Sequence, residues 1–462
     1  MNGALHAPLN SKQEKQAFYR MVFMLVLPIA AQNLINTAVS SADVVMLNFV
    51  GQNALAAVSA ATQVSFILSL FFYGLSSGAS VLTAQYWGKQ DYRTIEKIMG
   101  IAFRLSFCVA AGFALAAMFA PQVLMKIFTG DAALVAEGAA YLRIVSISFL
   151  FMSISTLYLN MMRSMERVML STITFLISFL VNILLNAVLI FGWFGLPKMG
   201  VMGVALATTS ARLVELIICL LDSARSKTVK IRIKYLFAKN PLLMKDFFSL
   251  SLPATFNEIV WGTGFSMYTV IMGHLSSDAL AANSLVQVVR NLASVVGFGL
   301  ANGSAVVIGK ALGEGREDAA KVYAKRLYRV TLMSAAVGAA IMLLVRPLVL
   351  MFAGDLTATA QSYLNIMLWI NVAYVAGQII NTFLICGVFR AGGDVKYGFY
   401  CDTIALWGVF IPLGFLCGYV LKLPVMVVYF VLCLDEWAKY PVNLYHYLKS
   451  NWARNITREW SE

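Results

Sequence analysis

Charged residues are scarce in this sequence: Asp, Glu, Lys and Arg make up 12% of its 462 residues, whereas 60% are hydrophobic. A soluble domain carries about 25% charged residues, so a cytosolic enzyme, a coiled coil, a disordered chain and a nucleic-acid-binding domain are disfavoured. Histidine is limited to three scattered residues, and no GxxxxGK[ST] phosphate-binding loop occurs. We therefore expect a membrane protein that is not an enzyme, has no resident cofactor, binds no nucleic acid and does not itself hydrolyse ATP.

Cysteine is also sparse, and its placement disfavours cysteine-based sites. All six cysteines fall inside apolar runs and lack the spacing of a zinc site. They are expected to be small core residues. The segment before the first apolar run lacks the apolar core of a signal peptide, so that run is expected to be retained as a span.

Long apolar runs dominate the rest of the chain. Each is close to the roughly 20 residues that a helix needs to cross a bilayer, and none alternates as a barrel strand does. The expected spans are 20–48, 54–80, 99–121, 141–162, 168–193, 200–221, 247–273, 279–305, 327–348, 361–386, 397–419 and 424–443. The sequence thus predicts an all-α membrane protein with twelve transmembrane helices.

The distribution of Lys and Arg orients these spans. With the N-terminus inside, the outer segments hold only Lys126, Lys198, Arg346 and Lys422, and most of the 35 Lys and Arg fall in inner segments. Because positive residues accumulate in cytoplasmic loops, both termini are expected in the cytoplasm. The basic central segment follows the same rule without needing a ligand.

The two halves of the chain repeat each other. LPIAAQN at Leu27 returns as LPATFNE at Leu252, a shift of 225 in the numbering, and RSMERV at Arg163 parallels RAGGDV at Arg390, a shift of 227. Six spans per half keep the same orientation, so these are parallel repeats, between which transporters place their substrate. The expected parts are two pseudo-symmetric six-helix lobes with a linker and a tail: N-lobe 1–221, cytoplasmic basic linker 222–246, C-lobe 247–448 and cytoplasmic tail 449–462.

Glycines and prolines mark packing and bending points. Gly74 and Gly78 have the four-residue spacing that lets helices approach closely, and the repeat returns this pair as Gly299 and Gly303. Pro28 and Pro253 interrupt the hydrogen bonding of the first span in each lobe and are predicted hinges.

Polar residues on the first span form a candidate cation site. Gln32, Asn36 and Asp43 are separated by four and seven residues, which places them on one helix face. Asn182 and Asn186 are one turn apart in the fifth span, at a depth close to that of Asp43. A carboxylate beside amide oxygens can hold Na⁺, with Asp43 and Asn182 as ligands, or the carboxyl can take a proton. The alternative for the asparagines is polar contact between packed helices.

A second polar group lies in the other half. Glu258 and Arg290 are placed near mid-membrane, where an ionisable residue costs about 2.5–3.5 kcal/mol. Glu258 either exchanges a proton or cation during transport or forms a permanent salt bridge with Arg290. Further members of this candidate site are Gln287, Asn371 and Gln378, with Asn381 nearby. Structural pairing is expected for Asp402, for Arg212 with Glu215, and for Asp435 and Glu436 at the inner end of the last span.

The sequence resembles the multidrug and toxic compound extrusion (MATE) family along its whole apolar length. The resemblance rests on LPIAAQNLINTAVSSADVVMLNFVG, NILLNAVLIFGWFGLPKMGVMGVALAT, LPATFNEIVWG and CGVFRAGGDVKYG. It implies two six-helix lobes around a central cavity, and export of amphiphilic, often cationic, compounds in exchange for Na⁺ or H⁺. Asp43 matches the family's cation-linked acid, and Asn182 its accompanying asparagine. Asn186 stands where one branch has an aspartate, and Ile379 where another has an acid.

The resulting hypothesis is an antiporter that works by alternating access. Cation binding or protonation at Asp43 would change the bend of the first span and expel the substrate. The expected partners are an amphiphilic small molecule and the lipid bilayer, with the protein a monomer. The rival functions are a lipid-linked oligosaccharide flippase, which would favour a strongly cationic cavity, and a membrane enzyme or a receptor without transport.

Overall fold

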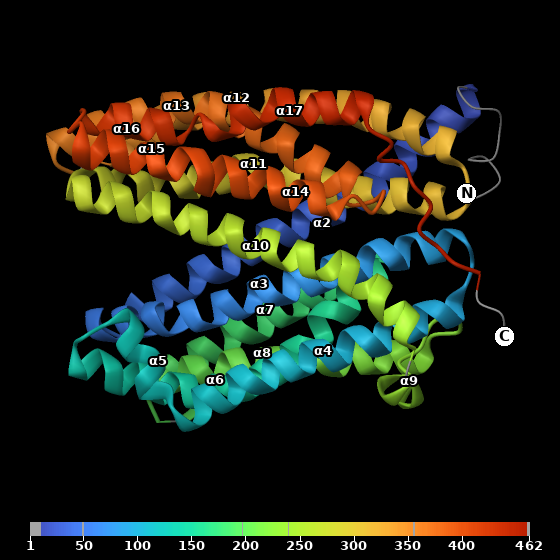
Figure 1. Cartoon of the computed structure of the whole chain (residues 1–462). Coiled ribbons are helices and arrows are strands. Elements are labelled where there is room, and N and C mark those ends of the chain that lie inside the picture. Colours follow the sequence, from blue (N-terminus) through green and yellow to red (C-terminus); the bar gives the residue numbers. More distant parts are fainter. Residues whose placement is uncertain (1–10, 49, 196, 239, 354–355, 460–462) are drawn as a thin grey trace. The chain divides into compact units, whose positions relative to one another are not determined.

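The computed structural model describes residues 11–459, except 49, 196, 239 and 354–355. The side chains of residues 37–45, 48, 194 and 352 also lie outside the described part. Within it the chain is helical, without a strand (Figure 1). The α-helices of the first half are α2 (Lys12–Asn48), α3 (Gln52–Gly88), α4 (Tyr92–Phe119), α5 (Pro121–Phe128), α6 (Ala132–Ser164), α7 (Val168–Phe191), α8 (Gly200–Arg225) and α9 (Ile233–Phe237).

The second half is more irregular. Its α-helices are α10 (Pro241–Leu275), α11 (Ser277–Gly313), α12 (Glu317–Phe352), α13 (Ala358–Thr382), α14 (Val395–Asp402), α15 (Ile411–Phe415), α16 (Val425–Leu432) and α17 (Asp435–Lys449). Three π-helical segments interrupt it: η2 (Phe383–Phe389), η3 (Thr403–Phe410) and η4 (Leu416–Val420). A short 3-10 turn, η1 (Trp193–Gly195), follows α7.

The helices confirm the all-α fold with its expected spans, although helix ends differ from the apolar limits. Each expected span lies in one helix or in consecutive helices, and ten helical stretches of the described chain are long and apolar enough to cross a membrane. The chain is an integral membrane protein. Hydropathy marks only the membrane-embedded part, whereas capping residues set the helix ends. At the start of α4, for example, Asp91 accepts a hydrogen bond from the backbone N–H of Thr94 at 3.0 Å. The preceding helix, α3, continues to Gly88, past the apolar limit at residue 80.

The last expected span is not one helix. It consists of α16 and α17, which are separated at Cys433 and Leu434. Because α17 continues to Lys449, the helical stretch is longer than 424–443, and Asp435 and Glu436 lie about 15–20 Å from either end of it at 1.5 Å per residue. They therefore lie near the middle of this helical stretch, and their position at the inner end of the membrane span stays a prediction.

The contacts within the chain divide it into two compact units. Unit 1 combines the chain up to Ala30 with the chain from Phe256 onward, and unit 2 is Ala31–Thr255. In unit 2 the helices α3, α4, α6, α7 and α8 pack on one another, and in unit 1 α11 packs on α12, α13 and η2. The lobe boundaries 1–221 and 247–448, which were derived from the repeat, stay a prediction. The contacts add that α2 and α10 each belong to both units.

Two pairs of turns between helices show the repeat at the level of the backbone. Gln90 (φ 64°) and Gly315 (φ 73°) are equivalent at the repeat's shift of 225 residues. Glu166 (φ 63°) and Gly393 (φ 81°) are equivalent at its shift of 227 residues. Each pair adopts the left-handed conformation in the same hydrogen-bonded turn. Glycine takes this conformation at little cost, whereas the first half places larger residues there.

Candidate functional site

The predicted first-lobe site is described only in part. Asp43 lies in α2, but its side chain is outside the described residues. Asn182 and Asn186 are buried on α7, and the Nδ2 of Asn186 donates to the Oδ1 of Asn182 at 3.2 Å. Asn36 is exposed on α2. The ligand roles of Asp43, Asn182 and Asn36 therefore stay predictions.

Gln32 is fixed on the start of α7. Its Nε2 donates to the Oγ of Ser171 at 2.8 Å and to the Oγ1 of Thr172 at 2.7 Å. The side chain is 1% exposed. A buried amide held by two hydroxyls positions α2 against α7 within unit 2.

Glu258 pairs with a residue that the sequence placed in a loop. Its Oε1 lies 2.9 Å from the Nη2 of Arg390, and the same Nη2 donates to the Oδ1 of Asn257 at 2.7 Å. The alternative that pairs Glu258 with Arg290 is therefore wrong. Hydropathy assigned Arg390 to an inner loop, but the residue folds back into unit 1 and is 8% exposed.

Arg290 is held by aromatic rings instead of a carboxylate. Its guanidinium carbon lies 4.4 Å from the centre of the Phe265 ring and 5.2 Å from that of the Tyr374 ring. The residue is 5% exposed, and its Nε has no hydrogen-bond partner within the described part of the chain. Stacking on ring faces is a favourable environment for a guanidinium removed from water.

The other predicted members of the second-lobe site are dispersed over separate contacts. The Nε2 of Gln287 donates to the Oγ1 of Thr269 at 3.2 Å, and the Oγ of Ser294 donates to the Oε1 of Gln378 at 3.2 Å. The Nδ2 of Asn371 donates to the hydroxyl of Tyr429 at 2.7 Å. These contacts join neighbouring helices, and none of them involves Glu258.

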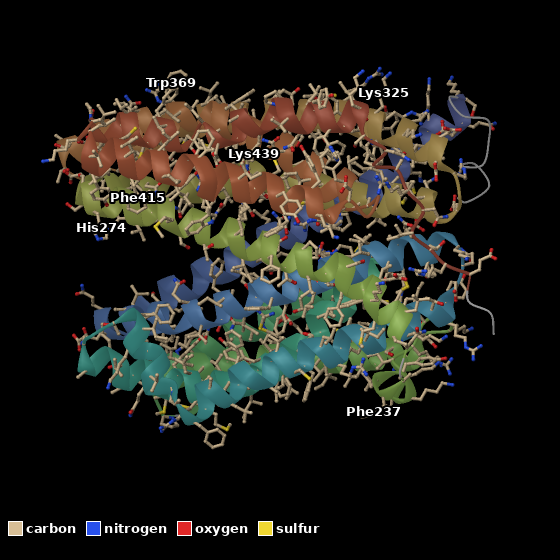
Figure 2. The ribbon with its side chains drawn as sticks, viewed as in Figure 1. Phe237, His274, Lys325, Trp369, Phe415 and Lys439 are labelled. Carbon is tan, nitrogen blue, oxygen red and sulfur yellow. The ribbon has the colours of Figure 1, made fainter. Side chains whose placement is uncertain are left out.

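A buried ionic cluster in unit 1 brings together residues that the sequence suggested only as structural pairs. The Nζ of Lys439 lies 2.9 Å from the Oε1 of Glu436, 3.2 Å from the Oδ1 of Asp402 and 3.5 Å from the Oδ2 of Asp435. Figure 2 shows Lys439 inside the bundle, away from its ends. Lys439 had a signal in the sequence, because it follows Asp435 and Glu436 by four and three residues on one helix face.

The predicted hinge prolines lie where α2 and α10 pass from one unit to the other. Pro28 precedes the boundary after Ala30 by two residues, and Pro253 precedes the boundary after Thr255 by two residues. A proline inside a helix removes one backbone hydrogen bond and bends it. The position of both prolines supports the hinge prediction without testing it.

The predicted glycine pairs of each repeat contact the first part of the other repeat's first helix. A Cβ at Gly74 would lie 2.6 Å from the Cβ of Thr255, so α3 touches the first part of α10 in unit 2. In unit 1, a Cβ at Gly299 would lie 3.1 Å from the backbone nitrogen of Ala30, so α11 touches the first part of α2. Glycine makes this approach possible because it has no side chain. The two repeats thus exchange the first parts of their first helices.

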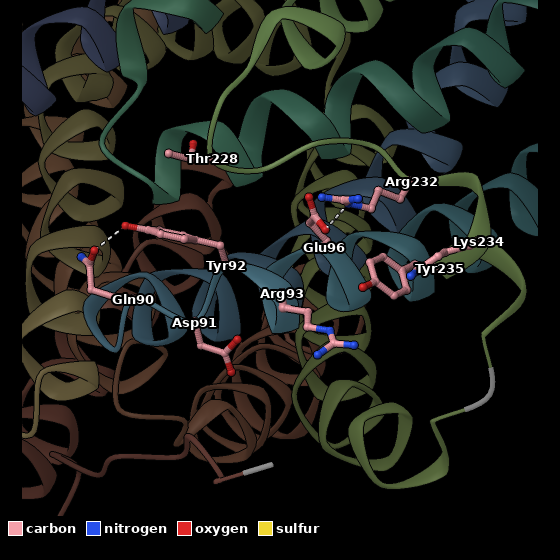
Figure 3. Close-up of a pocket in the computed structure, with 9 residues that line it drawn as sticks. All are labelled: Gln90, Asp91, Tyr92, Arg93, Glu96, Thr228, Arg232, Lys234 and Tyr235. Carbon is pink, nitrogen blue, oxygen red and sulfur yellow. Dashed lines mark hydrogen bonds and ion pairs between the residues drawn. The ribbon is translucent and has the colours of Figure 1, made fainter. Parts of the chain in front are cut away.

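A polar cavity of about 520 Å³ lies in unit 2, beside the basic linker (Figure 3). Within it, the Nε of Arg232 lies 2.6 Å from the Oε2 of Glu96, and the backbone N–H of Lys230 donates to the Oε1 of Glu96 at 3.0 Å. The backbone of Tyr235 approaches Gly100, where a Cβ would be 2.6 Å from its carbonyl carbon. The linker is therefore docked on α4. The cavity residues are Gln90, Asp91, Tyr92, Arg93, Glu96, Thr228, Arg232, Lys234 and Tyr235.

Two repeated helical halves, apolar spans and buried charged residues together define a helical membrane transporter. The MatE family model matches residues 28–188 and again residues 253–416, which also confirms the internal repeat. The chain belongs to this family of multidrug and toxic compound extrusion transporters.

Curated relatives cover almost the whole chain. The uncharacterized transporter YisQ of Bacillus subtilis is 24% identical over 90% of this chain and 91% of its own length. The probable multidrug resistance protein YoeA of the same organism is 23% identical over 97% of this chain and 98% of its own. The probable multidrug resistance protein NorM of Thermotoga maritima is 22% identical over 97% and 96%.

Solved structures share the fold. A MOP-superfamily transporter from Pyrococcus furiosus superposes with a TM-score of 0.84 at 16% identity, covering 93% of this chain and 95% of the other. A MATE structure in a bent conformation gives 0.84 at 15% identity over 93% and 95%, and one in a straight conformation gives 0.82 at 17% over 94% and 95%. At these identities the likeness establishes the fold alone.

Proposed function

We propose that this protein exports amphiphilic, cationic small molecules across the bacterial cytoplasmic membrane in exchange for Na⁺ or H⁺. Both termini face the cytoplasm in this proposal, and a single chain in the bilayer performs the transport. The observation that supports it best is the sharing of α2 and α10 between the two units, with a proline beside each crossing point. A helix that belongs to both units transmits a bend in one to the other.

Asp43 is the proposed coupling group in unit 2. It follows Pro28 on the same helix by about four turns, so a change of its charge acts on the helix that crosses between the units. Gln32 fixes this helix to α7 just past the crossing. Loss of the negative charge at Asp43, by protonation or cation binding, changes which conformation of α2 is favoured.

The flippase alternative is less well supported. A pyrophosphate-binding cavity would need exposed cations. Of the two candidate cations, Arg290 is 5% exposed between two rings, and Arg104 is half-buried with its Nη2 3.3 Å from the Sδ of Met244. The curated relatives are named as transporters or multidrug resistance proteins, which supports a transporter over an enzyme.

The test is dye efflux from proteoliposomes with Na⁺ and pH gradients imposed separately. The proposal expects export of a cationic dye under one or both gradients and none when both gradients are absent. Efflux that is independent of both gradients, or no efflux under either, contradicts it. Assaying lipid-linked oligosaccharide movement in the same vesicles decides the flippase alternative.

A further inference from the structure

Three interrupted helices of unit 1 meet at one buried cluster. Asp402 is the last residue of α14 before the π-helical η3, and Asp435 is the first residue of α17 after the break from α16. Asn381 lies two residues before the π-helical η2. Interruptions of this kind cost backbone hydrogen bonds, and in transporters they accompany ion-handling sites.

The cluster is closed to solvent and centred on one ammonium group. Lys439 contacts the carboxylates of Asp402, Asp435 and Glu436, at the distances given above. The exposed fractions of these four residues do not exceed 5%. A monovalent cation would have to occupy the place that the lysine ammonium already fills.

Five of the six carboxylate oxygens have a donor. Those that do not face Lys439 are served by amides: the Nδ2 of Asn257 donates to the Oδ2 of Asp402 at 2.7 Å, and the Nδ2 of Asn381 donates to the Oε2 of Glu436 at 2.8 Å. The sixth, the Oδ1 of Asp435, is buried and has no hydrogen-bond partner in the part of the chain that the structure describes. Asp435 itself is 1% exposed.

The charges of the cluster do not balance. Three carboxylates face one ammonium, and the nearby Arg390 is engaged by Glu258. An excess of buried negative charge is costly, and one proton on a carboxylate reduces it while supplying a hydrogen-bond donor. The buried hydroxyl of Tyr268, which interacts electrostatically with Asp435, also lacks a hydrogen-bond partner within the described residues.

We propose that Asp435 binds a proton on its unpartnered oxygen, as a second proton site of the transporter that is separate from Asp43. The groups that interact with it electrostatically come from its own helix, from the break before that helix and from three other helices. They are Glu436, Lys439, Cys433, Asp402 of α14, Tyr268 of α10 and Tyr374 of α13. Neutralising Asp435 strengthens the hold of Lys439 on Asp402. Asp402 in turn binds Asn257, the second residue of α10 beyond its crossing into unit 1.

The direct test is infrared difference spectroscopy of the purified protein during a pH titration. Protonated aspartic acid gives a carbonyl-stretch band that isotope-labelled aspartate displaces. We expect a component of this band to be lost in Asp435→Asn and kept in Asp318→Asn, because Asp318 is exposed on the first turn of α12. An unchanged band in Asp435→Asn overturns the proposal.

A second variant keeps the test decisive if Asp435→Asn does not fold. Asp402→Asn removes a neighbouring negative charge, which favours the charged form of Asp435, so the same band should require a lower pH to appear. A band that appears at the same pH overturns the proposal.

The role of Asp435 in coupling rests on the proposed export function, whereas its binding of a proton does not. A transport measurement distinguishes a failure of one from a failure of the other. In proteoliposomes, Asp435→Asn should lower pH-gradient-driven dye efflux by about tenfold, with dye binding retained. If the wild type pumps no dye under any gradient, the proposed function fails, and the infrared band still decides the proton site. If the wild type and Asp435→Asn respond equally to the pH gradient, the coupling role of this site fails alone.

Discussion

Gln32 and Asn257, which occupy equivalent positions in the repeat, perform the same task in the two units. Each lies four residues after a proline and just past the point where its helix enters a new unit. Gln32 binds Ser171 on α7, and Asn257 binds Asp402 on α14, the equivalent helix of the second half. Each crossing point is therefore fixed on both sides: a glycine contact precedes it and an amide contact follows it.

The prolines at these crossings should matter for transport more than for stability. Pro28→Ala and Pro253→Ala restore a helical hydrogen bond and should lower dye efflux by about tenfold, because the shared helices lose their bend points. Pro347→Ala is the matched control, since Pro347 is also inside a helix but is far in sequence from the crossing points. Thermal unfolding and efflux are measured for all three. Wild-type efflux by Pro28→Ala would argue against the hinge.

The glycine contacts give a ranked prediction of stability. Gly74→Ala and Gly78→Ala should lower the free energy of unfolding by about 1–3 kcal/mol, because the new methyl group overlaps α10. Gly299→Ala should cost less, since its nearest atom is 3.1 Å away.

The control for these variants is Gly112→Ala on α4, which meets no atom within 4 Å and should raise stability slightly. Melting temperatures in detergent give the order of all four variants. Equal effects at Gly74 and Gly112 would mean that α3 and α10 are not in contact.

The left-handed turns allow stability to be gained. At Gln90 and Glu166 the left-handed conformation costs about 1–2 kcal/mol, of which glycine would recover part after its own entropy loss of about 0.5–1 kcal/mol. Gln90→Gly and Glu166→Gly also remove the hydrogen bonds of Gln90 with Tyr92 and of Glu166 with Trp87, so the unfolding free energy should rise by only about 0.5 kcal/mol. The reverse changes, Gly315→Gln and Gly393→Glu, should lower it. Unfolding midpoints that move in the opposite sense would contradict the repeat-derived assignment of these turns.

Sequence periodicity predicted what depends on local composition. Runs of apolar residues gave the spans, because hydropathy depends on neighbouring residues, and the comparison of LPIAAQN with LPATFNE, 225 residues apart, gave the repeat. The partner of Glu258 could not be obtained in this way, since Arg390 belongs to a polar segment that hydropathy assigns to a loop. The match between RSMERV and RAGGDV marked Arg390 as part of the repeat but not as buried.

The buried ionic environment of Asp435 was not predicted for a related reason. The last apolar run ends at residue 443, because Asn443, His446 and Lys449 lower the apolar average although α17 continues through them. The exchange of helix parts between the repeats is a tertiary effect. The spacing at Gly74 and Gly299 predicted close helix packing, but it does not show which helix packs against each glycine.

The measurement that tests the account most directly is gradient-driven dye efflux by the wild type and Asp43→Asn in proteoliposomes. The control is Asp131→Asn, which removes a carboxylate from the cap of α6 but leaves an asparagine that can accept the same backbone hydrogen bonds. The account predicts that Asp43→Asn loses gradient-driven efflux while still binding dye, and that Asp131→Asn pumps as the wild type does. Wild-type coupling in Asp43→Asn would contradict the account.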